Sequence, residues 1–246
     1  IKVNGTKILF LEEHYLRLMA SMRICRMEIP MNFTMEFMEE EILKLIALQA
    51  NTVSNRIRFS VFRNAEGFYH PTSNDVQFII TCSELPSDTF VFSSTTYEVE
   101  LFKDFYVSKH LLATLKTNYK MINVVASIFA KENNFQNCLL INEDKNVVEV
   151  TNGNIFMKMG NQIITPPISD GCLNGIMRKQ VIAIVAKMDE YEMIEKSISP
   201  FDLQKADELF ISNVITGIQP ITKYRKKDFT SELAKEITSL LNALIN

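Results

Sequence analysis

Hydrophobic and polar residues follow two different periods along the chain, and these periods predict where helices and strands lie. Apolar residues three or four positions apart predict a helix that begins near Glu12 and ends at Pro30. The same spacing predicts helices over residues 34–50 and 119–133. Over residues 56–63 apolar and polar residues alternate, which predicts a strand with one apolar face. Shorter apolar runs predict further strands at residues 68–70, 76–82, 97–101, 138–142, 146–150, 155–159, 162–165 and 208–213.

Residues that favour helix ends predict the remaining helices. Gly175 is expected to open a helix that continues to about residue 187. Ser199 and Pro200 form a helix start, because serine caps a first turn and proline is preferred at the first helical position. Ser231 is expected to cap a final helix. The apolar face predicted for this helix consists of Leu233, Ile237, Leu240 and Leu244.

The order of these elements predicts an α+β fold in which the first part of the chain pairs its strands mostly antiparallel. The regular pattern lapses over residues 102–110, and we place a domain boundary there. Residues 1–104 are therefore expected to form a smaller N-terminal α+β domain, and residues 105–246 a larger C-terminal domain.

The composition is that of a globular protein, and it argues against several classes of function. Of the 246 residues, 47% are hydrophobic and 22% are charged. A formal net charge of −3 without a long basic run argues against nucleic-acid binding. No apolar run is long enough for a membrane helix.

The cysteines and histidines suggest no disulfide framework and no zinc site. The four cysteines are far apart, which is typical of a reduced protein of the cytoplasm. The three histidines are also scattered. The chain shows no signal peptide, and because its first residue is Ile1 we expect further residues to precede it.

Four short segments carry the chemistry when they are taken together. The first is Leu115-Lys116-Thr117-Asn118-Tyr119. The second is Val148-Glu149-Val150-Thr151-Asn152-Gly153-Asn154-Ile155-Phe156, whose glutamate lies 33 residues after Lys116. Then come Thr165-Pro166-Pro167 and Leu173-Asn174-Gly175-Ile176-Met177-Arg178. In this order and spacing they resemble the class IV enzymes that use pyridoxal 5'-phosphate: branched-chain and D-amino-acid aminotransferases and aminodeoxychorismate lyases.

The resemblance implies a two-domain fold with the cofactor, pyridoxal 5'-phosphate, in the cleft between the domains. It identifies Lys116 as the lysine that binds the cofactor covalently and serves as the base at the substrate carbon. It identifies Glu149 as the acid beside the pyridine nitrogen, where a carboxylate keeps the ring protonated and able to accept negative charge. Asn154 stands at the asparagine of the family's V-x-E-x-x-x-x-N signature. Without the resemblance, Lys116 reads as a surface charge and Glu149 as a solvent-facing strand acid.

Two helix segments are expected to bind the cofactor phosphate. A glycine that opens a helix leaves free backbone amides at the positive end of the helix dipole, where an anion is stabilised. Together with the resemblance to the family's L-x-G-I-x-R segment, this predicts phosphate binding by the amides of Ile176 and Met177, and it leaves Arg178 open to a structural role. Arg17 lies in a segment, His14 to Leu18, that resembles the family's H-x-x-R-L, so the resemblance implies that it reaches the phosphate. The alternative is a surface arginine on its helix.

Two further candidates rest on the resemblance alone. Asn213 lies in a segment that resembles the family's last active-site loop. In some members a threonine in this loop touches the phosphate, but Val214 or Ile215 stands at that position here, so only backbone contact is expected. Tyr119 is a candidate to face the ring hydroxyl. It follows the lysine by three residues, whereas the tyrosine of branched-chain aminotransferases follows it by five.

The resemblance implies an enzyme that acts on a small-molecule amino substrate. We favour 4-amino-4-deoxychorismate lyase, which gives pyruvate and 4-aminobenzoate, because the residues from Asn174 to Arg178 and the Asn213 loop look closer to the lyases. The alternative is a transaminase of branched-chain or D-amino acids. A third reading is a non-enzymatic relative, against which Lys116 and Glu149 together argue. Family members are generally homodimers, so we expect a homodimer that binds neither nucleic acid nor membrane.

Overall fold

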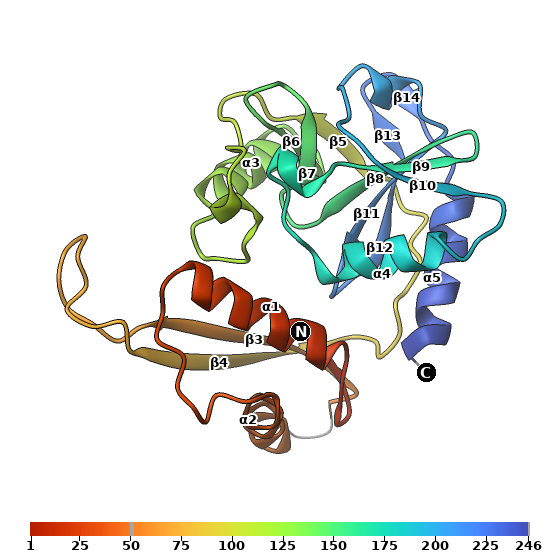
Figure 1. Cartoon of the computed structure of the whole chain (residues 1–246). Helices are drawn as coiled ribbons and strands as arrows, with labels where there is room; N and C mark the ends of the chain where they lie inside the picture. Colours follow the sequence, from red (N-terminus) through yellow and green to blue (C-terminus); the bar gives the residue numbers. More distant parts are fainter. Residues whose placement is uncertain (50–51, 246) are drawn as a thin grey trace. The chain divides into compact units, whose positions relative to one another are not determined.

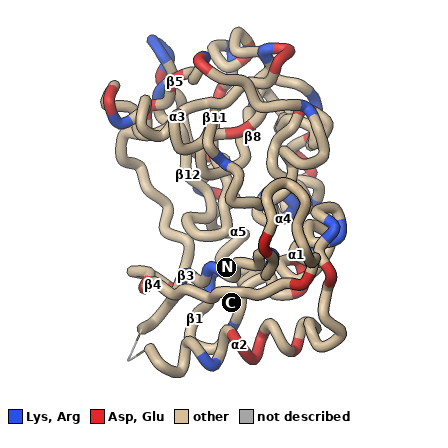
Figure 2. Tube along the Cα trace, turned by 90° about the vertical axis from the view of Figure 1, so that its left-hand side faces the viewer, with Lys and Arg blue, Asp and Glu red and all other residues tan. Residues whose placement is uncertain are grey.

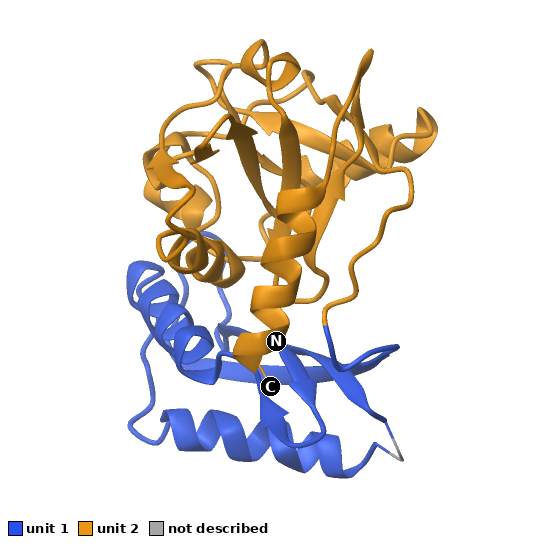
Figure 3. Cartoon of the chain, turned by 90° about the vertical axis from the view of Figure 1, so that its right-hand side faces the viewer, with its two compact units in different colours: residues 1–89 blue, residues 90–246 orange. Residues whose placement is uncertain are grey.

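The computed structural model describes residues 1–49 and 52–245, and it has the predicted α+β fold (Figure 1). The chain divides into two compact units, Ile1–Thr89 and Phe90–Asn246 (Figure 3). This division comes earlier than the boundary that we placed after residue 104. The reason is strand β5 (Glu98–Leu101), which pairs with β6 (Asn137–Ile141) and β13 (Lys223–Tyr224) and so belongs to the second unit.

Unit 1 consists of an antiparallel sheet and two helices. Its elements are β1 (Lys2–Asn4), β2 (Lys7–Ile8), α1 (Leu11–Ile24), α2 (Met35–Ala47), β3 (Ser54–Arg63) and β4 (Val76–Leu85). The strand order is β2-β1-β3-β4. The buried residues Val3, Met38, Ile42 and Ile57 form the centre of its core, so the apolar stripe of α2 packs on the sheet as its spacing predicts.

Both predicted helices of unit 1 are confirmed, but α1 ends earlier than predicted. Arg26 adopts a left-handed backbone conformation (φ 56°), which a right-handed helix cannot continue, so α1 ends well before Pro30. Thr34 caps α2 by accepting a hydrogen bond from the first turn of the helix. Ala50, the predicted end of this helix, lies outside the described residues.

The long strands β3 and β4 are confirmed, whereas the strand predicted at residues 68–70 is wrong. Phe68 and Tyr69 lie in the loop between β3 and β4, and both side chains are fully exposed. An apolar run forms a strand only where a sheet buries one of its faces. This loop offers no such face, so the local pattern alone was misleading.

Unit 2 contains two five-stranded sheets and three helices. Its further elements are α3 (Met121–Glu132), β7 (Val147–Val150), β8 (Asn154–Met159), β9 (Gln162–Thr165), α4 (Ile176–Val185), β10 (Glu192–Glu195), β11 (Glu208–Asn213), β12 (Gly217–Ile221), β14 (Lys227–Asp228) and α5 (Glu232–Ile245). The sheet orders are β14-β13-β5-β6-β7 and β10-β9-β8-β11-β12.

These elements form four layers within the unit. One core fills the space between the two sheets and includes Leu139, Ile155 and Leu209. A second core lies between α3 and the other face of the first sheet, and includes Ala126 and Leu140. Helix α4 packs against β11, and α5 packs against β12. Helix α3 therefore covers the outer face of the first sheet. The lysine segment directly precedes α3 in the chain.

Most predicted elements of unit 2 are confirmed, including the hairpin of β8 and β9. The α-helix predicted at Ser199 and Pro200 is wrong, because only a single 3-10 turn, Asp202–Gln204, follows them before the chain enters β11. Helix α5 is confirmed, but its predicted face is partly wrong. Leu240 and Leu244 are 39% and 54% exposed, because the helix buries the residue that follows each of them.

Glu208, a residue of β11, accepts hydrogen bonds from the first backbone amides of α5. The buried carboxylate of Glu208 accepts from the backbone N–H groups of Leu233 and Ala234, at 3.1 and 3.4 Å. Lys158 lies 3.8 Å from the same carboxylate. A strand residue thus fixes the start of the last helix.

Lysines or arginines and aspartates or glutamates occur along the Cα trace of both units (Figure 2). Within the described residues, no helix is long and apolar enough to cross a membrane. No group of three or more potential metal-binding side chains occurs in the part of the chain that the structure describes. All four cysteines are free thiols.

Candidate active site

Glu149 lies on β7, and an irregularity of that strand determines which way its side chain faces. Val147 pairs with Ile141 and Glu149 pairs with Leu140, so Val148 is an extra residue in β7. Glu149 therefore shares the face of Leu140, which α3 covers. Strict alternation from Val147 would instead have directed Glu149 into the core between the sheets.

The carboxylate of Glu149 is buried and has partners on two sides. The residue is 4% exposed. Its Oε2 accepts a hydrogen bond from the backbone N–H of Leu173 at 2.7 Å, and its Oε1 lies 3.9 Å from Nζ of Lys120. Burial raises the pKa of Glu149, whereas Lys120, the Leu173 amide, a hydrogen bond with Asn123 and the charge of Lys116 act in the opposite direction. Glu149 is therefore not a solvent-facing strand acid.

The loop before α4 connects Glu149 to Asn154 through a single residue. Leu173 donates its N–H to Glu149, and its carbonyl accepts a hydrogen bond from Nδ2 of Asn154 at 2.8 Å. Asn154 is 3% exposed. Because both contacts use main-chain atoms of Leu173, the backbone of the loop is held against β7 and β8 at once.

The same loop also holds the lysine segment. The N–H of Asn174 donates to the carbonyl of Thr114 at 3.1 Å, two residues before Lys116. Thr114 ends a short 3-10 turn, Leu111–Thr114, and its hydroxyl donates to the carbonyl of Leu111. The structure therefore brings the predicted lysine, the predicted acid and Asn154 to one loop at the start of one helix.

Gly175 caps α4 and leaves no room for a side chain. A Cβ atom built on Gly175 would lie 2.1 Å from Oδ1 of Asn154. No side chain caps this helix. The amides of Ile176 and Met177 belong to its first turn, where backbone N–H groups have no acceptor within a helix. The first turn of α4 therefore begins at the loop that contacts Glu149, and anion binding by these amides stays a prediction.

Two lysines lie close to the Glu149 carboxylate. Lys116 is exposed, and its charge acts on Glu149. Lys120 is the N-cap residue of α3, and its Nζ donates to the carbonyl of Ala113 at 3.2 Å. We did not predict a role for Lys120 or for Asn123. The one signal in the sequence is their spacing of three residues at a helix start, which places both on one face.

Arg178 has a structural position. Its side chain is 4% exposed, donates from Nη2 to the carbonyl of Pro166 at 2.8 Å, and forms an ion pair with Glu195 on β10 at 2.5 Å. These contacts join α4 to the chain after β9. The structural role that we left open for Arg178 therefore fits its contacts.

In unit 2, Asn213 is half-buried at the end of β11, and Tyr119 lies in the segment before α3. Oδ1 of Asn213 accepts hydrogen bonds from the N–H groups of Ile215 and Thr216 at 3.0 and 2.9 Å, so this side chain shapes the turn between β11 and β12. Tyr119 is 90% exposed. Direct contact of either residue with a cofactor stays a prediction.

Arg17 belongs to unit 1, on α1. It is partly buried, and burial lowers its pKa to about 10. On the same helix His14 is buried, and burial lowers its pKa well below 6.5. The contact of Arg17 with a phosphate also stays a prediction.

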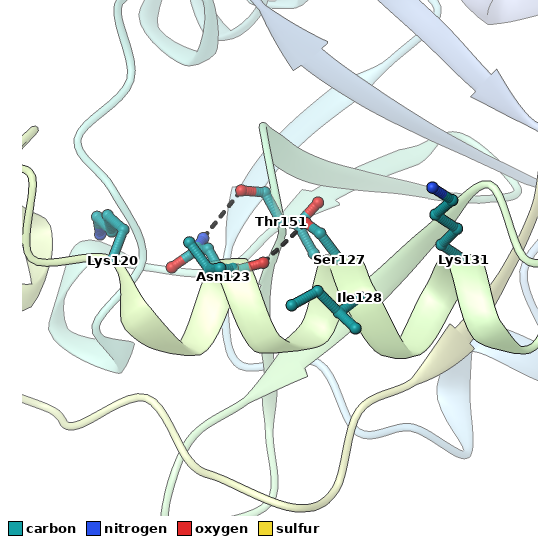
Figure 4. Close-up of a pocket in the computed structure, with 7 residues that line it drawn as sticks. Lys120, Asn123, Ser127, Ile128, Lys131 and Thr151 are labelled. Carbon is teal, nitrogen blue, oxygen red and sulfur yellow. Dashed lines mark hydrogen bonds between the residues drawn. The ribbon is translucent and has the colours of Figure 1, made fainter.

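In unit 2, a shallow concavity runs along α3, and Lys120 is one of the residues that line it (Figure 4). Its lining residues are Lys120, Asn123, Val124, Ser127, Ile128, Lys131 and Thr151. In the close-up, the Asn123 side chain points to Thr151, whose carbonyl accepts its Nδ2 at 2.9 Å. Glu149 is not among the lining residues, so the concavity lies beside the carboxylate and does not enclose it.

The site thus places a buried acid near two lysines, beside a helix that glycine opens. The chain matches the family model of amino-transferase class IV over residues 1–224. It therefore belongs to the class IV aminotransferases, a family of enzymes whose cofactor is pyridoxal 5'-phosphate.

Curated relatives with this similarity are aminotransferases. The mitochondrial branched-chain-amino-acid aminotransferase 1 of Arabidopsis thaliana is 33% identical over 105 residues, which are 42% of this chain and 27% of the relative. A Thermotoga maritima protein assigned as a branched-chain-amino-acid aminotransferase is 23% identical over 232 residues, which are 93% of this chain and 77% of the relative. The matched part thus spans about a quarter of the first relative and three quarters of the second.

Solved structures confirm the fold. A Legionella pneumophila protein assigned as a 4-amino-4-deoxychorismate lyase superimposes with a TM-score of 0.84 at 22% identity, over 99% of this chain and 88% of that protein. An aminotransferase of Brucella abortus bound to pyridoxal 5'-phosphate superimposes with a TM-score of 0.83 at 20% identity, over 96% and 83% of the two chains.

Proposed function

We propose that this chain binds pyridoxal 5'-phosphate through Lys116, Glu149 and the amides of Ile176 and Met177, and that it acts as a 4-amino-4-deoxychorismate lyase. The observation that carries the proposal is the loop at Leu173. Its hydrogen bonds connect the lysine segment, the buried acid and the start of α4.

The residues fit the chemical groups of this cofactor. The amides at the start of α4 offer an anion site for the phosphate. Glu149 offers a buried carboxylate to the pyridine nitrogen. Lys116 offers an accessible amine to the aldehyde. When it is bound, the cofactor supplies a conjugated ring that accepts the negative charge formed at the substrate carbon.

The chain's own groups would then have separate tasks. Glu149 would hold a proton on the ring nitrogen, because an ionised carboxylate in a buried site favours a cation beside it. Lys116 would take up a proton from the substrate carbon and return one, as a general base and acid. The α4 amides would fix the position of the phosphate, which orients the ring toward both residues.

The likeness to the Legionella protein over 99% of the chain, and the residues from Asn174 to Arg178, support the lyase reaction. The products would be pyruvate and 4-aminobenzoate. The second candidate is an amino acid transaminase, and the relatives from Arabidopsis and Thermotoga favour it. The same cofactor site serves both reactions, so the substrate must be tested directly.

A covalent label tests the cofactor site. The protein is loaded with pyridoxal 5'-phosphate, reduced with borohydride, digested and analysed by mass spectrometry. We expect one label per chain, on Lys116, which Lys116→Ala removes. The matched control is Lys131→Ala, an exposed lysine of α3 that should keep the label. A label that persists in Lys116→Ala at full stoichiometry would refute the assignment.

Product analysis then separates the two reactions. Release of pyruvate from 4-amino-4-deoxychorismate, with no spectral change on addition of branched-chain or D-amino acids, supports the lyase. Conversion of the bound cofactor to its pyridoxamine form by one of these amino acids, without pyruvate from 4-amino-4-deoxychorismate, supports the transaminase and refutes the lyase.

The homodimer is also part of the proposal. Large apolar side chains of unit 2 are exposed close together in sequence: Phe105, Tyr106, Leu111, Leu112, Tyr119, Met121, Val124 and Ile128. Exposed apolar surface of this extent is typical of an interface. We expect Ile128→Glu, at a position 51% exposed, to give the monomer mass in sizing with light scattering. Ile79→Glu, at a position 54% exposed in unit 1, is the control. A wild-type monomer would refute the dimer.

A further inference from the structure

Lys120 has no task in the proposed function, although its Nζ lies 3.9 Å from the carboxylate of Glu149. We propose that Lys120 is a positioning residue that acts through Glu149, as the counter-ion that keeps this carboxylate ionised for the ring nitrogen of the cofactor. This inference rests on the proposed function for the identity of the ring, but not for the effect of Lys120 on Glu149.

The geometry links Lys120 to both halves of the site. Its Nζ lies 3.9 Å from Oε1 of Glu149 and donates to the carbonyl of Ala113 at 3.2 Å. Ala113 lies in the turn that precedes Lys116. The side chain of Lys120 is 23% exposed and that of Glu149 is 5% exposed. The ammonium group thus reaches inward from the start of α3 to a carboxylate that water hardly contacts.

The charge balance around Glu149 gives this contact its importance. Burial disfavours the ionised carboxylate, and the cations that oppose this effect are Lys120 and, to a smaller extent, Lys116. Cys172 also faces the carboxylate, but burial raises its pKa to about 12, so the thiol is neutral. Covalent attachment of the cofactor would bond the amine of Lys116 to the cofactor. Lys120 would then be the cation that remains available to Glu149.

The hydrogen-bond donors to Glu149 orient it but do not supply charge. Leu173 donates a backbone N–H and Asn123 contributes its side chain. Among the groups that lower the pKa of Glu149, Lys120 has the largest effect, ahead of the Leu173 and Asn123 donors. Removal of the Lys120 charge should therefore leave Glu149 in the same place and raise the pH at which it ionises.

The decisive experiment uses cofactor-free protein, so that it does not depend on the enzyme reaction. Glutamate is labelled with 13C at the carboxyl carbon, and the Glu149 signal is assigned by its loss in Glu149→Gln. We expect the signal to titrate at a higher pH in Lys120→Met than in wild type. Lys120→Arg, which keeps the charge, should titrate near wild type. Lys131→Met removes a lysine from the same concavity and should have no effect.

Equal titration midpoints in wild type and Lys120→Met would overturn the proposal. Circular dichroism and the Lys120→Arg variant show whether a change reflects charge or loss of folding. In the loaded enzyme, kcat of Lys120→Met should fall at neutral pH with little change in KM. It should recover as the pH rises, because a Glu149 of raised pKa ionises later. An unchanged pH profile of kcat would count against the role.

The outcomes keep this inference separate from the proposed function. A raised Glu149 midpoint in Lys120→Met, together with no borohydride label on Lys116, would support the counter-ion role and refute cofactor attachment. A label on Lys120 instead of Lys116 would overturn the counter-ion role, because the amine would then carry the cofactor itself.

Discussion

Replacement of Gly175 by alanine tests the contact between the start of α4 and the buried Asn154. The new Cβ would lie 2.1 Å from Oδ1 and 3.3 Å from Cγ of Asn154. Because Asn154 is 3% exposed, its side chain has little room to move away. Any rotation that relieves the clash breaks the 2.8 Å hydrogen bond from Nδ2 to the Leu173 carbonyl.

The magnitude follows from that hydrogen bond. A buried polar group left without a partner costs about 1–3 kcal/mol. The backbone of Gly175 (φ −74°, ψ 140°) suits alanine, which would by itself add about 0.4–1 kcal/mol of stability through the unfolded state. Alanine is a poorer N-cap than glycine, which offsets this gain. Gly175→Ala should therefore lower the free energy of unfolding by about 1–3 kcal/mol.

A double-mutant cycle makes the test specific. In an Asn154→Ala background the clashing atom is absent, so Gly175→Ala should change the free energy of unfolding little. The coupling between the two substitutions should be about 1–3 kcal/mol. Urea unfolding of the four cofactor-free proteins, with comparable slopes, measures it. If Gly175→Ala costs the same in both backgrounds, Asn154 does not occupy the space beside Gly175.

Three further predictions follow from the burial of single groups. Burial raises the pKa of Glu149, so ionisation of this group destabilises the folded state as pH rises above its ordinary value of 4.5. Glu149→Gln should gain stability relative to wild type as the pH rises above 4.5, and a constant difference in thermal melts would contradict this. Burial raises the pKa of Cys138 to about 11 and that of Cys172 to about 12. Both should react with a thiol reagent only after denaturation, while the two half-buried cysteines react in native protein, and four native reactions would be the contrary result. Glu208→Ala leaves two amides of α5 without their acceptor and should cost about 1–3 kcal/mol in urea unfolding, whereas Glu208→Gln costs less.

The sequence was sufficient for the elements that carry their own signal. The period of apolar residues found α2 and α3, and the alternation over residues 56–63 found β3. The sequence pattern failed where contacts with an element distant in the chain determine the local structure. Phe68 and Tyr69 look like strand residues but lack a sheet face, and β12 forms because β11 pairs with it. The register of α5 depends on the sheet beneath it, so Leu240 was assigned to the wrong side.

Some residues of the candidate site could likewise be predicted from the sequence, and others could not. Lys116 and Glu149 were selected through the resemblance, because the order of segments is a property of the sequence, and their roles stay predictions. Lys120 could not be found, since its contact with Glu149 depends on the extra residue Val148 in β7, which turns the carboxylate toward α3. A bulge is set by strand pairing, and pairing is not visible in the alternation of β7 alone.

The hydrogen bonds of the loop before α4 have a consequence for how such a site can evolve. Leu173 and Asn174 hold the lysine segment, Glu149 and Asn154 entirely through main-chain atoms. Their side chains are half-buried and carry none of these bonds. Natural variation at positions 173 and 174 can therefore change the side chains of this loop while the hydrogen bonds that hold Glu149, Asn154 and the lysine segment are kept.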